Sequence, residues 1–473
     1  MAKKSLSRRE FLIGAASVSG AAILAACAPQ VVTQTVEQTV EVPVQQTVEV
    51  PVQQTVEVPV QQTVIVQAPA AAGPVVLTCA HAWEAAFEAH QEDFDNNFMK
   101  ANPNIFIKRI NSDWNAHNQI VPTWAAAGEL PDIIYVHGSR AYPWNQQGIL
   151  ITIDNYTASD TAFNVAGIWP EALKLYQYKG KQFEIPYDHG PVIMGYNMDL
   201  FDKAKMPYPT ETWTMDDFLA AAKKLTIPGK QWGYSGYYGL TVDKSNEYAV
   251  SLVGPWGGSV FTDDESKLVI DSPESIAALK WWADMYTQKI VPNAAESTAF
   301  PAGVWVAGSA AMFGLATWGV PQMHDFGNFK YDVAPWPKGP KAQKTGSFGS
   351  GYGITKDSKN PDVAWKYLSA YLDVDGMDFM WASSGRGSPA RLACRDAYIK
   401  AAINPPHAAY FYDAMDKYAE TGHPYHTMAS GEVLDIMAKY FGLIATGEMK
   451  VEDSVANIIK EANPKLAAAA AQS

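Results

Sequence analysis

The chain has 473 residues, of which 48% are hydrophobic and 12% aromatic, and its formal net charge at pH 7 is −13. This acidity argues against a nucleic acid as partner. The part beyond residue 73, about 400 residues, is long enough for two lobes that each have a hydrophobic core.

The first 26 residues are predicted to be an export signal. Basic residues, including the pair Arg8-Arg9, precede an apolar run that is too short to span a bilayer comfortably. Paired arginines followed by Phe-Leu are typical of a twin-arginine signal. The run ends in LAAC, which resembles the lipobox of bacterial lipoproteins, so Cys27 is predicted to carry a lipid anchor. An uncleaved signal anchor is the alternative. Cleavage would remove four basic residues and one acidic residue and take the net charge from −13 to −16.

Residues 27–73 are predicted to form an extended stalk. The octapeptide QQTVEVPV occupies Gln45–Val52 and Gln53–Val60 and begins a third time at Gln61. A proline in each full repeat interrupts strand pairing, and a segment without aromatic residues cannot bury enough surface to fold alone. Such a stalk could reach on the order of 100 Å. A small β-solenoid is the alternative.

Strands alternate with helices in the part that follows. The pattern predicts strands at Val75–Thr78, Ile105–Ile107 and Pro131–Val136, and helices at Glu84–Ala101 and Val121–Gly128. This alternation favours a mostly parallel sheet, in which ligands bind beyond the carboxyl ends of the strands. The predicted strand ends carry these candidate ligand-binding residues: Trp83, Asp113, Trp114, His137, Ser139 and Arg140.

Aromatic residues are abundant, with fifteen tryptophans and twenty-three tyrosines. A flat ring can stack on the apolar face of a sugar while nearby polar groups bind its hydroxyls. Six tryptophans are predicted to lie in loops: Trp83, Trp114, Trp144, Trp256, Trp318 and Trp381. Trp281 and Trp282 share a predicted helix with Leu279 and Met285, which favours core packing there. Thr214 and Asp217 have the spacing of a helix N-cap, with the helix continuing to Leu225.

Five segments occur in an order and spacing similar to those of the substrate-binding proteins of ABC-type importers, within the maltose-binding group of extracellular solute-binding proteins. They are PDIIYVHGSRAYPWNQQGIL, GKQFEIPYDHGPVIMGYNMDLFDKA, ETWTMDDFLAAAKKLT, AGSAAMFGLATWG and KDSKNPDVAWKYLSAYL. The similarity covers about residues 75–465. HGSR retains the arginine of the maltose binders but not the adjacent acid.

The resemblance implies an α/β, two-lobed periplasmic-binding-protein fold of type II, with hinged lobes whose central sheets are mostly parallel and flanked by helices. The expected lobes are residues 74–188 plus about 349–400, and about 189–348 plus about 401–473. Crossings are expected near Tyr187–Pro191 and Gly346–Gly353, and closing helices within Gly447–Leu466. Further candidate ligand-binding residues are Tyr187, Asp188, Trp256, Trp318, Tyr352 and Arg386. The family commonly stacks a sugar on the tryptophan that corresponds to Trp318.

The expected function is therefore capture of a carbohydrate outside the cell by a monomeric lipoprotein, with delivery to a permease and no cofactor. Arg140 and the histidines at positions 81, 117 and 137 leave an acidic sugar or another anionic solute as an alternative, and these histidines leave a metal site open. Nucleophile-elbow, zinc-protease and phosphate-loop motifs are absent from the sequence. A carboxylate pair for glycoside hydrolysis, an adhesin-like role and a Cys79–Cys394 disulfide stay open.

Overall fold

The computed structural model describes residues 73–82, 88–236, 249–421 and 426–471. The predicted signal peptide, Cys27, the stalk up to residue 72 and the candidate Trp83 lie outside these residues. Among the described helices none is both long and apolar enough to cross a membrane.

The first sheet contains six strands in the order β12-β11-β3-β1-β2, with β6 paired to β11. β1 is parallel to both β2 and β3, and β12 is parallel to β11, whereas β11 is antiparallel to β3 and β6. The strands are β1 (Val75–Ala82), β2 (Ile105–Ser112), β3 (Ile133–His137), β6 (Glu184–Pro191), β11 (Thr345–Ile354) and β12 (Ala419–Thr421). The predicted strands are thus confirmed, and β1 and β2 are longer than predicted.

The second sheet has the order β10-β7-β9-β8. Its strands are β7 (Ile193–Asn197), β8 (Trp232–Tyr234), β9 (Ala310–Leu315) and β10 (Tyr331–Ala334). Only β8 and β9 pair in parallel among these described strands, and their long connection holds helices, as a parallel crossover requires. The prediction of mostly parallel sheets is therefore wrong for this sheet. A separate hairpin pairs β4 (Gln177–Tyr178) with β5 (Lys181–Gln182).

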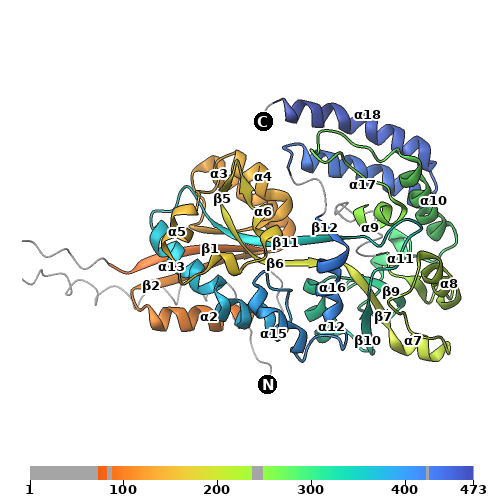
Figure 1. Ribbon diagram of the computed structural model, residues 1–473, viewed down its shortest axis with the longest axis horizontal. Helices are drawn as coiled ribbons and strands as arrows, with labels where there is room; N and C mark the ends of the chain where they lie inside the picture. Colours follow the sequence, from red (N-terminus) through yellow and green to blue (C-terminus); the bar gives the residue numbers. More distant parts are fainter. Residues whose placement is uncertain (1–72, 83–87, 237–248, 422–425, 472–473) are drawn as a thin grey trace, which may run out of the picture. The chain divides into compact units, whose positions relative to one another are not determined.

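Helices flank both sheets (Figure 1). Those from the first half of the chain are α2 (Glu88–Ala101), α3 (Trp114–Ala127), α4 (Gly138–Gln146), α5 (Asp154–Ser159), η2 (Val165–Gly167), α6 (Pro170–Leu175), α7 (Met198–Lys203) and α8 (Met215–Leu225). Next come α9 (Ala249–Val253), η4 (Gly254–Trp256), α10 (Pro273–Thr287), α11 (Ala294–Thr298), η5 (Thr317–Gly319), α12 (Val320–Phe326) and α13 (Pro361–Leu372). The last are α14 (Val374–Met377), the π-helix η6 (Asp378–Ala382), η7 (Leu392–Cys394), α15 (Arg395–Lys400), α16 (Ala409–Lys417), α17 (Ser430–Thr446) and α18 (Val451–Ala470).

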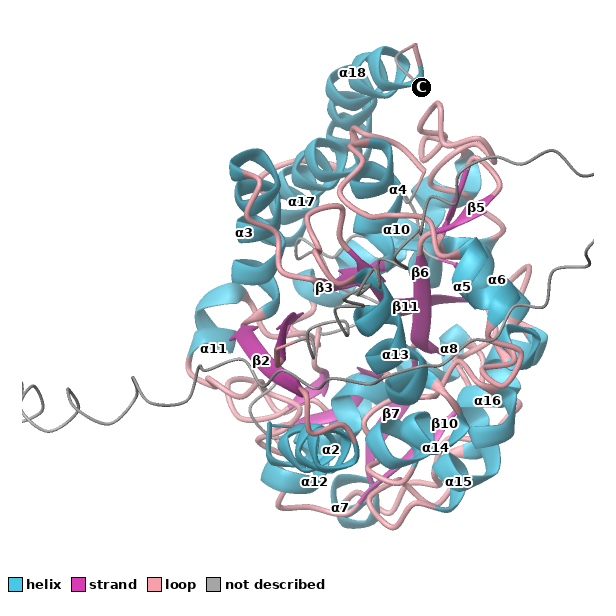
Figure 2. Cartoon of the chain, turned by 90° about the vertical axis from the view of Figure 1, so that its left-hand side faces the viewer, coloured by secondary structure: helices cyan, strands magenta, loops and turns pink. Residues whose placement is uncertain are grey.

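The two segments predicted to cross between the lobes lie side by side as β6 and β11 (Figure 2). Asp188 is opposite Ser350, and the register shifts between Ser350 and Gly351. A single residue, Val192, separates β6 from β7, so the chain passes there from the first sheet into the second. The return passage runs from β10 to β11.

Two helix boundaries differ from the prediction. α3 begins at Trp114 rather than Val121 because Asp113 caps it: an Asp113 carboxylate oxygen accepts a hydrogen bond from the Ala116 N–H at 3.0 Å. The helix continues through Pro122. At the other end of the chain, Gly447 does not begin a helix but ends α17 in the left-handed conformation, with φ of 75°. The closing helices are therefore α17 and α18.

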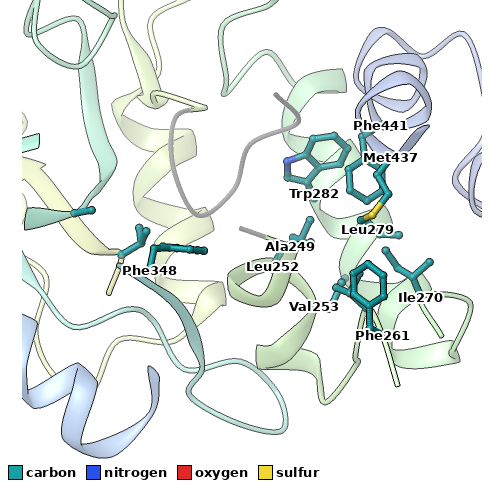
Figure 3. Close-up of a cluster of buried hydrophobic side chains, with 14 of the residues drawn as sticks. Ala249, Leu252, Val253, Phe261, Ile270, Leu279, Trp282, Phe348, Met437 and Phe441 are labelled. Atoms are coloured by element: carbon teal, nitrogen blue, oxygen red, sulfur yellow. The ribbon is translucent and has the colours of Figure 1, made fainter. Parts of the chain in front are cut away.

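The hydrophobic core contains several tryptophans. Trp282 is fully buried, with its ring 6.0 Å from that of Phe441, so the core packing predicted for it is confirmed (Figure 3). Trp144 lies buried in α4 and Trp381 lies buried in η6. The prediction of loops at these two positions is therefore wrong. Cys79 and Cys394 are both buried and free, so the structure contains no bridge between them.

α8 begins with a capping box, as its sequence predicts. The Asp217 N–H donates to the Thr214 hydroxyl at 3.2 Å, and the Thr214 N–H donates to the Asp217 carboxylate at 2.9 Å. Replacing Thr214 with alanine is expected to lower the free energy of unfolding by about 1 kcal/mol. Urea denaturation would measure this change, and Thr298→Ala on the exposed end of α11 is the control, with an expected change below about 0.5 kcal/mol. Equal effects of the two substitutions would contradict the capping role.

Candidate ligand-binding site

The ends of β2 and β3 bring several predicted site residues together. β1 is parallel to both strands, so their carboxyl ends lie at one edge of the sheet, where α3 and α4 begin. The rings of Trp114 and His137 are 5.6 Å apart and nearly perpendicular. Trp114 is 38% exposed, which leaves much of its indole available to a ligand. This edge therefore carries an accessible aromatic surface beside polar groups.

His137 caps the helix that follows it. Its Nδ1 lies 2.8 Å from the Ser139 hydroxyl and accepts from the Ser139 N–H at 3.4 Å. Burial, with a smaller contribution from the charge of Arg140, lowers the pKa of His137 to about 3. The ring is thus neutral at physiological pH and adds no positive charge to the site. Ser139 is fully buried behind it.

Arg140 points toward α17. Its Nη1 atom lies 3.9 Å from the position that a Cβ on Gly431 would occupy. The side chain therefore reaches from α4 to a helix that packs against α10 and α18. Its role in ligand binding stays a prediction.

A buried ion pair lies where β6 and β11 pair. An Asp188 carboxylate oxygen accepts from the Ser350 N–H at 2.8 Å, and the other lies 3.8 Å from Arg386 Nη1. Asp188 and Arg386 are 4% and 9% exposed. A Cβ on Gly387 would lie 3.3 Å from that second oxygen, so the small residue lets the segment after Arg386 approach Asp188 closely.

This segment forms a third strand-like partner at the crossing. The His189 N–H donates to the Ser388 carbonyl at 3.2 Å, the Ser388 hydroxyl donates to the His189 carbonyl at 2.7 Å, and the Ala390 N–H donates to the Tyr187 carbonyl at 2.9 Å. Chain segments nearly 200 residues apart therefore meet at Asp188. Sequence reasoning located β6 and β11 at the crossing but missed this partner.

Tyr187 and Tyr352 lie in a buried aromatic cluster beneath the ion pair. The Tyr187 ring stacks on Trp381 at 4.6 Å, and the Arg386 guanidinium carbon lies 5.9 Å from the ring centre of Tyr187. The Tyr352 hydroxyl is 2.9 Å from His81 Nδ1. Because both tyrosine rings are at least 96% buried, they support Asp188 and Arg386 rather than present a stacking face in this conformation. Ligand contact by either tyrosine stays a prediction.

Trp318 lies beside the crossing strands in the second lobe. It belongs to η5, is half-buried, and its ring lies 6.1 Å from that of Phe348 on β11 in an edge-to-face arrangement. The preceding Thr317 is buried, and its hydroxyl oxygen would lie 2.9 Å from a Cβ on Gly190. Phe348 was not predicted from the sequence, although its position between the glycines of β11 was a usable signal.

Trp256 has a different environment. Its ring is 5.0 Å from that of Trp281 on α10, and it packs against the hydrophobic core of the second lobe. This packing does not test the predicted ligand-binding role of Trp256, which stays a prediction. Within the described residues, no group of three or more His, Cys, Asp or Glu side chains is arranged to hold a metal ion.

Two α/β lobes joined by paired crossing strands, with polar and aromatic groups at the junction, define a hinged solute-binding protein. Residues 94–409 match the family of bacterial extracellular solute-binding proteins, and the chain belongs to that family. The resemblance and the two-lobed fold expected from the sequence are thereby confirmed.

Curated relatives and solved structures agree with this assignment. A binding protein of Brucella abortus is 26% identical over 317 residues, 64% of this chain and 73% of the relative. The maltotriose-binding protein of Pyrococcus abyssi is 23% identical over 253 residues, 51% of each chain. An ABC substrate-binding protein of Listeria monocytogenes, in complex with cycloalternan, superposes with a TM-score of 0.74 at 25% identity, covering 82% of this chain and 98% of its own. An ABC transporter solute-binding protein from Thermotoga lettingae, bound to α-D-tagatose, superposes with a TM-score of 0.72 at 20% identity, covering 83% of this chain and 100% of its own.

Proposed function

We propose that this protein is a receptor, lipid-anchored through Cys27 on the outer face of the cytoplasmic membrane, that binds a carbohydrate between its lobes. It delivers the sugar unchanged to the permease of an ABC importer. The observation that carries the proposal is the half-buried indole of Trp318 beside the crossing strands β6 and β11, where Asp188 of β6 pairs with Arg386. An aromatic face with a nearby carboxylate and guanidinium can bind the apolar face and the hydroxyls of a sugar.

The relatives support a carbohydrate ligand. One is named for maltotriose and another, from Bacillus subtilis, for arabinooligosaccharide, and related structures hold mannotriose and cycloalternan. Because Asp188 lies beside Arg386, the ion pair contributes no net charge to the site. This arrangement favours a neutral sugar over the acidic solute that Arg140 leaves open.

Closure of the lobes follows from the position of the site. A solute that contacts both lobes binds more tightly when they meet, and it therefore shifts the population toward the closed state. The proposed lobe boundaries are those expected from the sequence. The protein is proposed to release its ligand without breaking a bond, in keeping with a family of binding proteins.

A thermal-shift screen against neutral mono- and oligosaccharides tests the proposal. A sugar present at 100 times its dissociation constant is expected to add about 2.7 kcal/mol to the free energy of unfolding. Uronic acids form the comparison set, because preferential binding of these would favour the anionic alternative. Product analysis after incubation checks that the sugar is intact.

Replacing Trp318 with alanine is expected to weaken binding of that sugar by about 1–3 kcal/mol, since the stacking surface is lost. Isothermal titration calorimetry would measure the change, and Trp318→Phe, which keeps an aromatic face, should retain part of the affinity. Unchanged affinity in the alanine variant would remove Trp318 from the site.

A further inference from the structure

A second accessible indole, besides that of Trp318, lies at the carboxyl edge of the first sheet. Trp114 is the first residue of α3 and is 38% exposed, and its ring lies 5.6 Å from that of His137 at the end of β3. Trp318 belongs to η5, which follows β9 of the second sheet. The first sheet therefore positions one indole and the second sheet positions the other.

A series of neighbouring groups connects the two indoles. His137 lies opposite Ser350 in the pairing of β3 with β11, and the Ser350 N–H donates to an Asp188 carboxylate oxygen at 2.8 Å. Phe348 lies two residues before Ser350 on β11, and its ring is 6.1 Å from that of Trp318. We call the following six residues the Trp114–Trp318 row: Trp114, His137, Ser350, Asp188, Phe348 and Trp318.

The order of the strands separates the two ends of this row. β1 and β3 lie between β2, whose end precedes Trp114, and β11, which carries Phe348. Because neighbouring strands are about 4.8 Å apart, the end of β2 is roughly 14 Å from β11. Even with the Trp114 indole turned toward His137, the row is longer than a single sugar ring, which is similar in width to an aromatic ring. One monosaccharide therefore cannot stack on both indoles.

The polar groups beside Trp114 suit a sugar ring. Asp113 is exposed, and one of its carboxylate oxygens accepts from the Ala116 N–H at 3.0 Å, which fixes the side chain next to the indole. A carboxylate has several acceptor sites, so sugar hydroxyls can donate to it as well. The Asn118 amide donates to the Trp114 carbonyl at 2.7 Å and holds the first turn of α3 in place. An accessible ring beside a fixed acceptor can bind the apolar face and the hydroxyls of a sugar.

We propose that Trp114 forms a second sugar subsite and that the ligand is an oligosaccharide lying along the Trp114–Trp318 row, an inference that rests on the proposed function. One sugar unit stacks on Trp318, and another unit of the same chain stacks on Trp114. A ligand that contacts both indoles joins groups positioned by both sheets. It therefore favours the closed state more strongly than a monosaccharide does.

Sugars of increasing length test the proposal by isothermal titration calorimetry. Glucose, maltose and maltotriose form one series, and the mannose and arabinose series, each from one to three units, are measured beside it. In a series that binds, the trisaccharide is expected to bind at least tenfold more tightly than the monosaccharide. Equal affinities, or binding of the monosaccharide alone, overturn the oligosaccharide inference while the proposed function stands. Binding of no sugar, in these series or in the thermal-shift screen, refutes the proposed function itself.

Variants assign the gain in affinity to Trp114. Trp114→Ala is expected to weaken binding of the trisaccharide at least tenfold and to leave that of the monosaccharide within twofold, whereas Trp114→Phe should retain part of the gain. Phe106→Ala is the matched control, since Phe106 is 51% exposed and lies at the other end of β2, so both affinities should be unchanged. The monosaccharide affinity also shows that each variant is folded. Unchanged trisaccharide affinity in Trp114→Ala, or an equal loss for both sugars, overturns the second subsite.

Discussion

Replacing Arg391 with methionine is expected to lower the free energy of unfolding by about 3–5 kcal/mol, because three buried carbonyls lose their donor at roughly 1–3 kcal/mol each. Arg391 is 1% exposed, and its guanidinium donates to the carbonyls of Leu372, Asn164 and Phe163 at 2.6, 3.0 and 2.7 Å. Methionine fills much of the volume but leaves these buried carbonyls without their donors. Equilibrium denaturation in urea would measure the loss.

Two further variants distinguish the contribution of the three Arg391 hydrogen bonds from that of the volume its side chain fills. Arg391→Lys keeps the charge but cannot present donors in the fixed fork of a guanidinium, so it should recover only part of the stability. Arg395→Met is the control, because Arg395 forms a partly exposed ion pair with Asp416 at 2.9 Å and should change stability by about 1 kcal/mol or less. Full stability in Arg391→Lys or Arg391→Met would show that the three hydrogen bonds contribute little.

The fold was predictable where local pattern and chain order agree. The strands β1, β2 and β3 are apolar runs bounded by polar residues, and the crossing segments followed from the resemblance. The start of α3 was missed because Asp113 was assigned only to a ligand, whereas its carboxylate caps the helix. The antiparallel pairings of the second sheet depend on contacts between distant strands, for which the local sequence carries no signal.

The part of the site at the ends of β2 and β3 was predictable from the order of the strands along the chain. Trp114 and His137 follow strands that are both parallel to β1, so topology alone brings them together. The contact of Asp188 with Arg386 joins residues nearly 200 positions apart, and it requires the third segment at the crossing. Trp381 lies before a run of serines and glycines that is typical of a loop, yet its ring is buried against Tyr187.

Acid is expected to destabilise the folded protein through its buried histidines. Burial lowers the pKa of both His117 and His189 to about 4, from an ordinary value of 6.5. Between these values the unfolded chain binds protons that the folded chain does not bind, so stability is present above pH 6.5 and is lost as the pH falls toward 4. Buried Glu184 acts in the opposite direction, because burial raises its pKa and its contribution falls as the pH rises above 4.5.

Glutamine variants isolate the histidine contribution. Going from pH 7 to pH 5 should cost the wild type about 1–2 kcal/mol for each of His117 and His189, and His117→Gln or His189→Gln should remove that share. His117 Nε2 lies 2.9 Å from the Tyr135 carbonyl, and His189 Nε2 lies 3.2 Å from the Ser347 hydroxyl. Because glutamine can retain these contacts, the loss of a titrating group is separated from the loss of a hydrogen bond. His324→Gln is the control for the substitution itself, since that side chain is 57% exposed. If urea denaturation at the two pH values gives the same loss for all four proteins, protonation of His117 and His189 does not govern acid stability.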